Sequence, residues 1–339
     1  MRTISWNQGE GEILLLDQTR LPREAVELRI KDHHQLIDAI KRLAIRGAPA
    51  LGVAGAFGVA LIAKIAERDS WSKAQIESAV DELRSARPTA VNLAWGVDQV
   101  RPLLAEGAAS VLERALEMAD EDGRANRAMG SIGADFLIEL LAKSGKKEKF
   151  TLLTHCNTGA LATTEWGTAL GMIRELHERG KVREVFADET RPLLQGARLT
   201  AWELEQIGIP YRILPDGAAA SALFSGLIDA VAIGADRIAS NGDSANKIGS
   251  LAVAVAAHEM GIPFFVVAPE STVDRKLASG DQIEIEFRDD REVTEFAGVP
   301  TAPNGARTYN PAFDVTPARY ITAIVTDKKV YRVSEGETL

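Results

Sequence analysis

Cysteine is nearly absent from this sequence, because Cys156 is the one cysteine among 339 residues. A single cysteine allows no disulfide within the chain and no metal site built from several thiolates. None of the five histidines forms a His-x-x-x-His pair, and no acidic cluster has the spacing of a cation-binding loop. The sequence therefore predicts no metal site and a protein suited to a reducing compartment.

Positive charge is also scarce, since 39 Lys and Arg residues stand against 48 Asp and Glu residues, a net charge of −9. Proteins that bind nucleic acid usually present a strongly basic face. We therefore expect no nucleic-acid partner. A small basic pocket for an anionic metabolite remains compatible with this charge balance.

Long hydrophobic runs are missing as well. The longest uncharged stretch, Gly47–Ala63, is shorter than the roughly 20 residues that span a bilayer. Its many glycines and alanines favour a buried helix instead. The first twenty residues contain no apolar segment of the length found in secretion signals. The prediction is a cytoplasmic protein that does not contact a membrane.

The pattern of apolar residues divides the chain into two parts. Short alternating runs up to Ile30 predict a small strand-and-hairpin element, and helical spacing from His33 to about Leu141 predicts four or five helices. The charged stretch Ala142–Phe150 offers few apolar contacts and suits a boundary. We expect a hairpin and helical domain over residues 1–146 and a second domain over residues 147–339.

The second part alternates strands with helices. Strand-like runs lie at 150–154, 182–187, 211–214, 230–234 and 263–268, and helical patterns lie between them at 160–179, 195–207, 218–227 and 246–260. Nearly continuous apolar strands that alternate with helices favour a parallel sheet covered on both faces. The predicted fold class is α/β, with a Rossmann-like, doubly wound second domain.

Polar residues follow several of these strands, at the edge where open α/β sheets bind their ligands. Cys156 comes just after the first strand and, on the predicted pattern, leads into a helix. The positive end of a helix dipole favours a thiolate, which can act as base or nucleophile. The alternative is a small buried hydrophobic residue. His155 is a poor catalytic partner for Cys156, because neighbouring residues of an extended chain point to opposite faces.

Asp236 follows another apolar strand, with Gly234 and Ala235 beside it. A desolvated carboxyl group at such a place can keep its proton and serve as a general acid. A helix N-cap or a partner for Arg237 is the alternative, and for a single Asp after a strand it is the more common one.

Several further residues have the chemistry to hold an anion or a hydroxyl group. Arg46, Gly47 and Ala48 precede or begin a long helix whose first turn contains Pro49, and a helix N-terminus beside an arginine can bind an anion. Arg87 and Lys247 are isolated cations that suit a phosphate. Gln195 and Asn246 suit hydroxyl groups. Each could also be an ordinary surface or capping residue.

Six segments of the chain carry a resemblance to a known family: IRGAPALGVAGAFGVAL (45–61), ARPTAVNLAWG (86–96), LTHCNTGALAT (153–163), DETRPLLQGARLTAWEL (188–204), GADRIASNGDSANKIGS (234–250) and YNPAFDVTPARYITAIVT (309–326). They resemble the S-methyl-5-thioribose-1-phosphate isomerases of methionine salvage, within the family that includes the α, β and δ subunits of translation initiation factor 2B. The resemblance runs in order over most of the chain.

The resemblance implies a homodimer that converts 5-methylthioribose 1-phosphate into 5-methylthioribulose 1-phosphate without a metal or organic cofactor. It implies catalytic roles for Cys156 and Asp236. The implied substrate-binding residues are Arg46, Gly47, Ala48, Arg87, Gln195, Asn246 and Lys247. Two alternatives stay open: an isomerase of 5-deoxyribose 1-phosphate or ribose 1,5-bisphosphate, and a non-enzymatic regulatory subunit like those of the initiation factor.

Overall fold

The computed structural model describes residues 2–88, 90–145 and 148–339, which form two compact units. The first unit runs to Asn126 and also contains Gly159–Gly167, and the second contains Arg127–Thr158 and Thr168–Leu339. The expected boundary between residues 146 and 147 lies outside the described residues. The compact units instead divide within one continuous helix, α5 (Ala108–Lys143).

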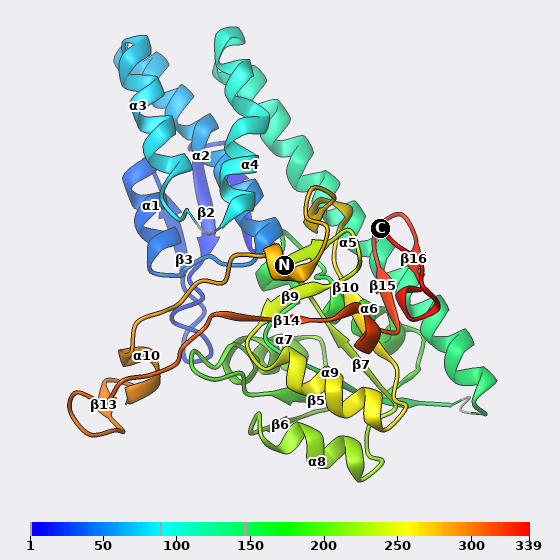
Figure 1. Cartoon of the computed structure of the whole chain (residues 1–339). Helices are drawn as coiled ribbons and strands as arrows, with labels where there is room; N and C mark the ends of the chain where they lie inside the picture. The colour runs from blue at the N-terminus through cyan, green and yellow to red at the C-terminus, as the bar shows by residue number, and fades with distance from the viewer. Residues whose placement is uncertain (1, 89, 146–147) are drawn as a thin grey trace. The chain divides into compact units, whose positions relative to one another are not determined.

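The first unit begins with a three-stranded antiparallel sheet of β1 (Ile4–Asn7), β2 (Glu12–Leu16) and β3 (Glu27–Ile30). It therefore contains the expected strand-and-hairpin element. Its further helices are α1 (His33–Lys41), α2 (Ala48–Asp69), α3 (Lys73–Arg84) and α4 (Val91–Val100), with a 3-10 turn over Arg101–Glu106 (Figure 1).

Helix α2 lies in the middle of the first unit's core. Its length and composition would suit a membrane span, but 83% of its most apolar 18-residue stretch is buried inside the protein. It packs so closely on α4 that a Cβ atom at Gly96 would lie 1.9 Å from the carbonyl oxygen of Gly52. The uncharged stretch after Arg46 is thus a buried core helix, as the sequence predicted.

The second unit is built on a seven-stranded sheet (Figure 1). In spatial order its strands are β16 (Val330–Tyr331), β15 (Ala323–Val325), β10 (Phe264–Val267), β7 (Ala230–Ile233), β4 (Phe150–Thr154), β5 (Val182–Asp188) and β6 (Tyr211–Leu214). Only β16 is antiparallel to its neighbour. Numbered along the chain, the six parallel strands lie in the order 3-2-1-4-5-6.

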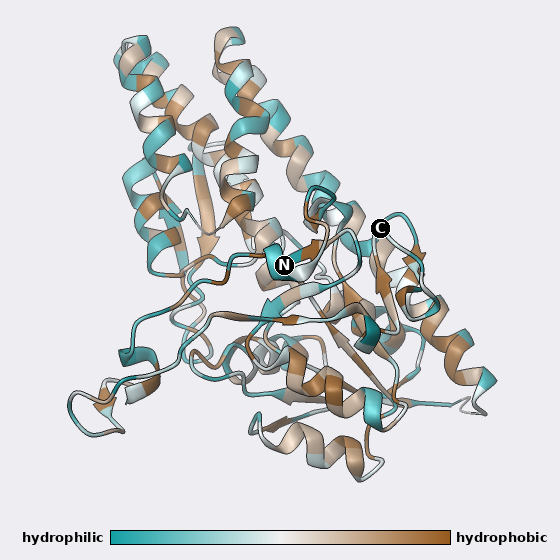
Figure 2. Ribbon diagram, in the orientation of Figure 1, coloured by the Kyte–Doolittle hydropathy of each residue, from teal (hydrophilic) through white to brown (hydrophobic). Residues whose placement is uncertain are grey.

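Both faces of this sheet are buried, which explains why its strands are apolar at nearly every position (Figure 2). On one face, strand residues such as Leu152 pack with α5 and α6 (Ala169–Glu178). On the other, residues such as Leu153 pack with α8 (Ala218–Phe224) and α9 (Ser250–Glu259). The predicted mixed α/β architecture with a parallel sheet is confirmed.

The four α-helices of the second part are all shorter than their sequence patterns, and two of them start late because the chain before them pairs elsewhere. The helix expected at 160–179 begins at Ala169, because the preceding segment forms hydrogen bonds within the first unit, including Thr3 N–H to the Thr164 carbonyl (3.0 Å) and Gln18 Nε2 to the Leu161 carbonyl (2.7 Å). The helix expected at 246–260 begins at Ser250.

Before that second helix, the chain forms a strand of a smaller sheet. Its order is β11 (Val273–Asp274), β8 (Arg237–Ala239), β9 (Ser244–Lys247) and β14 (Phe313–Thr316). Asn246 and Lys247 pair with Asp314 and Phe313 of β14, and Gly249 then turns the chain with a φ of 106°. This pairing replaces the first helical turn that the sequence pattern suggested.

Candidate active site

The order of the parallel strands reverses at β4, which has β5 on one side and β7 on the other. In open α/β sheets, the carboxyl ends of the strands beside such a reversal are the usual place for a ligand site. Cys156 is the second residue after β4, and Asp236 is the third after β7. The two residues singled out from the sequence thus flank the same point of the sheet.

Cys156 is buried, with 5% of its surface exposed, and its backbone has a φ of 62°. This left-handed conformation is unfavourable for a residue with a Cβ and persists only where the surroundings impose it. The Cys156 N–H donates to the Thr190 hydroxyl (2.8 Å), and the Thr200 hydroxyl donates to the Cys156 carbonyl (2.6 Å). The thiol was expected at the start of an α-helix. This expectation was wrong, because only a 3-10 turn at Ala160–Ala162 follows it.

Asp236 is half-buried at the start of the smaller sheet. Its N–H donates to the Ala245 carbonyl (2.8 Å), and the chain continues directly into β8. Asp236 is therefore no helix N-cap. Arg237 forms an ion pair with Asp274 at 2.6 Å. The capping alternative for Asp236 is thus excluded.

Gln195 immediately precedes a π-helical turn over Gly196–Thr200 that continues as α7 (Ala201–Gln206). A Cβ atom at Gly196 would lie 1.6 Å from the Asp188 carbonyl oxygen, so this close approach requires glycine. The side chain of Gln195 is 5% exposed, and its Oε1 has no hydrogen-bond partner among the described residues. A buried polar atom in this situation is costly unless a ligand or water satisfies it.

Asn246 and Lys247 are the last two residues of β9, directly before the turn that leads into α9. Asn246 Nδ2 donates to the Ser250 hydroxyl (2.8 Å), which in turn donates to the Lys247 carbonyl (2.8 Å). The ammonium of Lys247 donates to the Ala312 carbonyl (2.8 Å) and lies 4.4 Å from the centre of the Phe313 ring. These contacts hold the end of β9 against the chain that enters β14.

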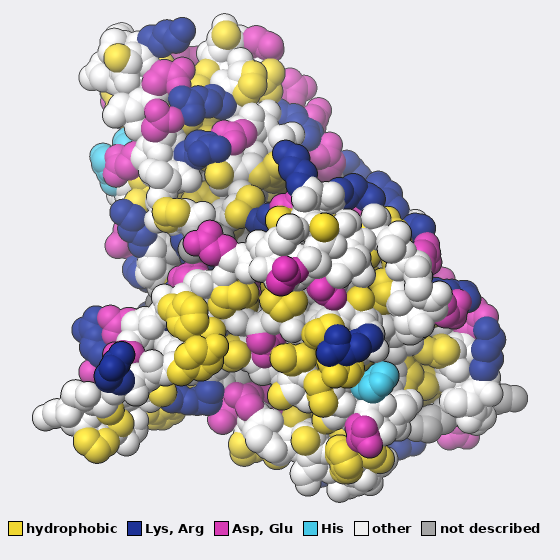
Figure 3. Space-filling view, viewed as in Figure 1, with side chains coloured by type: hydrophobic (Ala, Val, Ile, Leu, Met, Phe, Trp, Pro, Cys, Tyr) yellow, Lys and Arg dark blue, Asp and Glu magenta, His cyan; other side chains and the backbone are white. Residues whose placement is uncertain are grey.

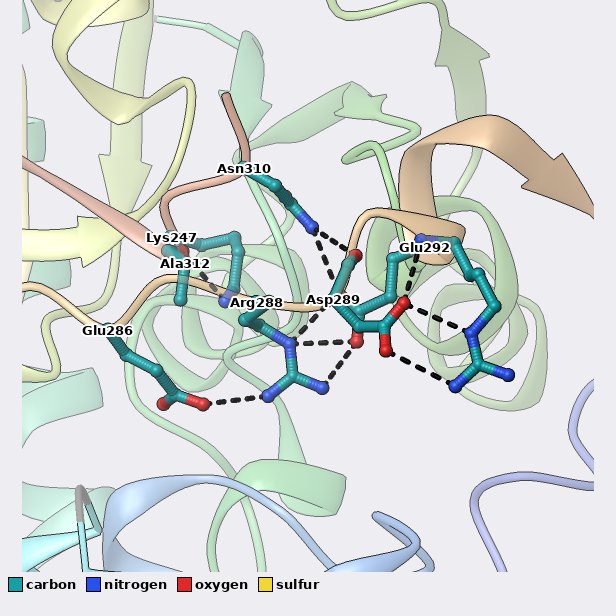
Figure 4. A network of polar contacts seen from close by, with 8 residues as sticks. Lys247, Glu286, Arg288, Asp289, Glu292, Asn310 and Ala312 are labelled. Atoms are coloured by element: carbon teal, nitrogen blue, oxygen red, sulfur yellow. Dashed lines mark hydrogen bonds and ion pairs between the residues drawn. The ribbon is translucent and has the colours of Figure 1, made fainter. Parts of the chain in front are cut away.

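The segment beside Lys247 is itself tied together by charge (Figure 4). Ala312 N–H donates to the Glu286 carbonyl (2.8 Å), and the guanidinium of Arg288 bonds Glu286 (2.9 Å) and Glu292 (2.9 Å). The hydrogen bonds to Glu292, with the charges of both carboxylates, hold the pKa of Arg288 above its usual value. Asn310 Nδ2 donates to the Asp289 carbonyl (3.1 Å). The surroundings of Lys247 are thus a closed network of polar contacts.

Two residues that the sequence prediction did not select, His155 and Asp188, are linked by hydrogen bonds to the turn after Lys247. His155 Nδ1 lies 2.8 Å from Asp188 Oδ2, and His155 Nε2 lies 2.8 Å from the Ile248 carbonyl. Burial lowers the pKa of His155, but the hydrogen bond to Asp188 and the charges of Asp188 and Asp216 outweigh it and raise that pKa. Their positions at the ends of β4 and β5 were the signal that could have identified them.

The ligand-type atoms of His155, Asp188 and Asp216 all lie within 4.8 Å of one another. Asp188 Oδ2 bonds His155, and Asp216 accepts the N–H groups of Thr190 and Arg191, each at 2.7 Å. Asp188 Oδ1 is buried without a hydrogen-bond partner among the described residues. His33, His34 and Glu82 form a second such group, in the first unit.

The remaining selected residues belong to the first unit. Gly47 is the N-cap of α2, with a φ of 95°, and Pro49 lies in the first turn, as expected. A Cβ atom at Gly47 would lie 2.3 Å from the Ala162 carbonyl oxygen, so glycine is needed here for two reasons. Arg46 and Ala48 flank it and are partly buried, and Arg87 is partly buried in the bend after α3.

A parallel sheet with a thiol, carboxyl groups, a buried amide and an ammonium group after its strands has the arrangement of an α/β enzyme that acts on a small molecule. The chain belongs to the Initiation factor 2 subunit family, whose model matches residues 44–331.

Three similar proteins are informative. A Nocardia farcinica protein described as a probable bifunctional methylthioribose-1-phosphate isomerase/methylthioribulose-1-phosphate dehydratase is 54% identical over 97% of this chain, which spans 58% of that protein's length. The 5-deoxyribose 1-phosphate isomerase of Moorella thermoacetica is 49% identical over 97% of this chain and 93% of its own. The crystal structure of 5-methylthioribose 1-phosphate isomerase from Pyrococcus horikoshii matches with a TM-score of 0.87 and 39% identity, over 98% of this chain and 92% of that one.

Proposed function

We propose that this chain is an aldose–ketose isomerase that converts 5-methylthioribose 1-phosphate into 5-methylthioribulose 1-phosphate in methionine salvage. The observation that carries the proposal is the position of Cys156 and Asp236 after the two strands where the sheet order reverses. The names of the similar proteins supply the substrate class. The strand order also supports a Rossmann-like description of the second unit.

The reaction has a specific difficulty, because the anomeric carbon carries a phosphate ester and the sugar ring cannot open to a free aldehyde. We assign Asp236 as the general acid that donates a proton to the ring oxygen as its bond to C1 breaks. Hydrogen then moves from C2 to C1, and C2 becomes the ketone carbon.

Two routes fit the residues. In the first, the Cys156 thiolate removes the C2 proton and the C2 hydroxyl gives its own proton to the Asp236 carboxylate, so that a phosphoenolate forms; the Cys156 thiol then returns its proton to C1. In the second, a hydride shifts directly from C2 to C1 while the C2 hydroxyl gives its proton to the Asp236 carboxylate. Both routes use side chains alone, so the proposal requires no metal or organic cofactor.

The substrate-binding roles are part of the same proposal. In the second unit, Gln195 and Asn246 would bind hydroxyl groups and Lys247 the phosphate; the unpartnered Oε1 of Gln195 supports its role. In the first unit, Arg46 and Arg87 would bind the phosphate together with the N–H groups of Gly47 and Ala48. The start of α2, a helix of 22 residues without a side-chain cap, supports that assignment.

We also propose a cytoplasmic homodimer without a nucleic-acid or membrane partner. Exposed apolar side chains around α8 and α9 (Figure 3), which include Phe224, Leu227, Val255 and Met260, suit a contact with a second copy.

Proton and phosphorus NMR in deuterium oxide tests the assignment. We expect the unmodified protein to form the ketose phosphate, and Cys156→Ala and Asp236→Asn to reduce turnover about 100- to 10,000-fold while they remain folded. Deuterium at C1 would support the phosphoenolate route, and retention of the substrate hydrogen would support the hydride route. Absence of turnover by the folded protein would exclude this substrate.

The second candidate, 5-deoxyribose 1-phosphate, is favoured by the Moorella thermoacetica relative. The two sugars differ at C5, which carries a methylthio group in one and only hydrogen in the other, and a hydrophobic pocket separates groups that differ by a single methylene about 10- to 200-fold. The same NMR assay with equal concentrations of both sugars measures the ratio of their kcat/KM values. A ratio above unity for the deoxy sugar would reverse the assignment.

A further inference from the structure

His155 and Asp188 are the most deeply buried ionisable pair of the second unit's described residues that the proposed reaction does not use, with side-chain exposures of 1% and 0%. The Ile248 carbonyl can only accept a hydrogen bond, so His155 Nε2 must carry a hydrogen. His155 Nδ1 then either donates to an ionised Asp188 or accepts from a protonated one. In both states, the ring is held at its two nitrogen atoms.

One end of this pair leads to the thiol. The Asp188 carbonyl accepts from the Thr190 hydroxyl (3.1 Å), and the same hydroxyl accepts the N–H of Cys156 (2.8 Å). His155 is the residue before Cys156, whose φ of 62° has to be imposed by its neighbours. The pair therefore restrains the Cys156 backbone in two ways: through the peptide bond that joins His155 to Cys156, and through the hydrogen bonds of Thr190.

The other end leads to the β9–α9 turn. The Ile248 carbonyl follows Lys247, and a Cβ atom at Gly249 would lie 2.8 Å from His155 Cε1. The imidazole thus packs directly against the turn that follows Asn246 and Lys247. Asp314, which accepts the N–H groups of Gly249 (2.8 Å) and Leu251 (3.1 Å), holds the same turn from β14.

We infer that His155 and Asp188 are positioning residues that set Cys156 and the Asn246–Lys247 turn in register with each other. This inference rests on the proposed function, because it concerns the alignment of the residues assigned there to base and substrate binding. It predicts that loss of either bond of the imidazole lowers turnover more than it lowers stability, since misplacement of a reacting group by about 1 Å can cost about 100-fold in rate.

Two substitutions of His155 separate its two bonds. His155→Asn places an amide N–H near Nδ1 and keeps a donor to Asp188 while it abandons Ile248. His155→Gln places an amide N–H near Nε2 and keeps the donor to Ile248 while it abandons Asp188. We expect kcat to fall about 10- to 100-fold in both, with a rise in KM in His155→Asn, because only that variant releases the substrate-binding turn.

Asp188 offers a rescue test. Asp188→Asn can donate its amide N–H to a neutral Nδ1 and preserve the geometry, whereas Asp188→Ala cannot. We expect the Asn variant to stay within about tenfold of the unmodified kcat and the Ala variant to fall well below it. If both variants lose activity equally while folded, charge rather than alignment is what Asp188 supplies, and the inference is wrong.

Asp229→Ala is the matched control, because Asp229 accepts the Thr151 N–H (2.8 Å) at the opposite end of the same strand, β4. It should lower the melting temperature and leave kcat unchanged. If the His155 variants also lose only melting temperature, the pair is purely structural and the inference fails. Should they not fold, Thr190→Val decides, since a folded variant with unchanged kcat would equally overturn it. Absence of turnover by the unmodified protein would instead overturn the proposed function.

Discussion

At the scale of single residues, the site combines backbone strain with deeply buried polar groups. Cys156, Thr190 and Leu194 all have a φ between 56° and 65°, and they lie on the two loops that leave β4 and β5. Such conformations cost about 1–3 kcal/mol each and persist where the surroundings over-determine them. Here the Thr190 hydroxyl, which accepts the Cys156 N–H, and the Thr200 hydroxyl, which donates to the Cys156 carbonyl, supply that restraint.

The raised pKa of His155 has a defined effect on stability. Burial alone would lower this pKa, but the hydrogen bond and charge of Asp188, with the charge of Asp216, raise it above the ordinary value of 6.5. A group whose pKa is higher in the folded state contributes its full stability below the unfolded pKa. That contribution is lost as the pH rises through the folded pKa.

We therefore expect the difference in unfolding free energy between the unmodified protein and His155→Gln to be largest below the unfolded histidine pKa of about 6.5 and to shrink as the pH rises above that value. Urea titrations at several pH values measure it, and comparison of the two proteins at each pH cancels the groups that they share. A difference that stays constant over this range would show that His155 does not carry a proton in the folded protein.

At the scale of elements, local patterns and distant partners differ in how far the sequence reveals them. The apolar strands β4, β5 and β7 were predicted almost to the residue, because burial on both faces marks the sequence directly. Strand β9 was missed because its partner β14 lies far along the chain and SANK has no strand-like composition.

The same distinction holds for the site. Cys156 and Asp236 were selected from their positions after strands, a local rule. Asp188 was not, because its role depends on His155, which lies 33 residues earlier. The segment Gly159–Gly167 was expected to be helical, since its hydrogen bonds to residues such as Thr3 and Gln18 are invisible to any short window.

The start of α2 allows a direct test at this scale. Gly47→Ala should destabilise the protein by about 2–4 kcal/mol, since the new methyl group meets the Ala162 backbone at 2.3 Å. Gly208→Ala is the control, because Gly208 also has a positive φ, 71°, but open space around it, and should cost only about 1 kcal/mol. Chemical denaturation of both variants measures the difference, and equal losses would show that the packing at Ala162 is not rigid.

At the scale of the whole molecule, the compact units do not follow the order of the chain. Helix α5 crosses from one to the other, and its second half places Met129, Leu137 and Leu141 in the core beneath the parallel sheet. A fragment that begins at the charged stretch near residue 147 would keep α6 on that face of the sheet but expose the part that α5 covers. Burial of each such side chain is worth about 1.5–3 kcal/mol.

We expect the fragment 127–339 to unfold cooperatively on heating and the fragment 147–339 to show no cooperative transition. Circular dichroism during a thermal scan distinguishes them. Both fragments contain Gly159–Gly167 without its partners, so the comparison isolates the contribution of α5. Identical melting curves for the two fragments would mean that the helix is dispensable for the second unit.

The return of residues 159–167 to the first unit has a consequence for the order of events on the ribosome. The Thr3 N–H and the Gln18 side-chain amide donate to carbonyl groups of this later segment, and Gly47 lies against its backbone. The amino-terminal half of the nascent polypeptide therefore cannot complete its packing until residues 159–167, which follow Cys156, have been translated and have left the exit tunnel. The loop that contains Cys156 is thus synthesised shortly before the first unit can complete its folding.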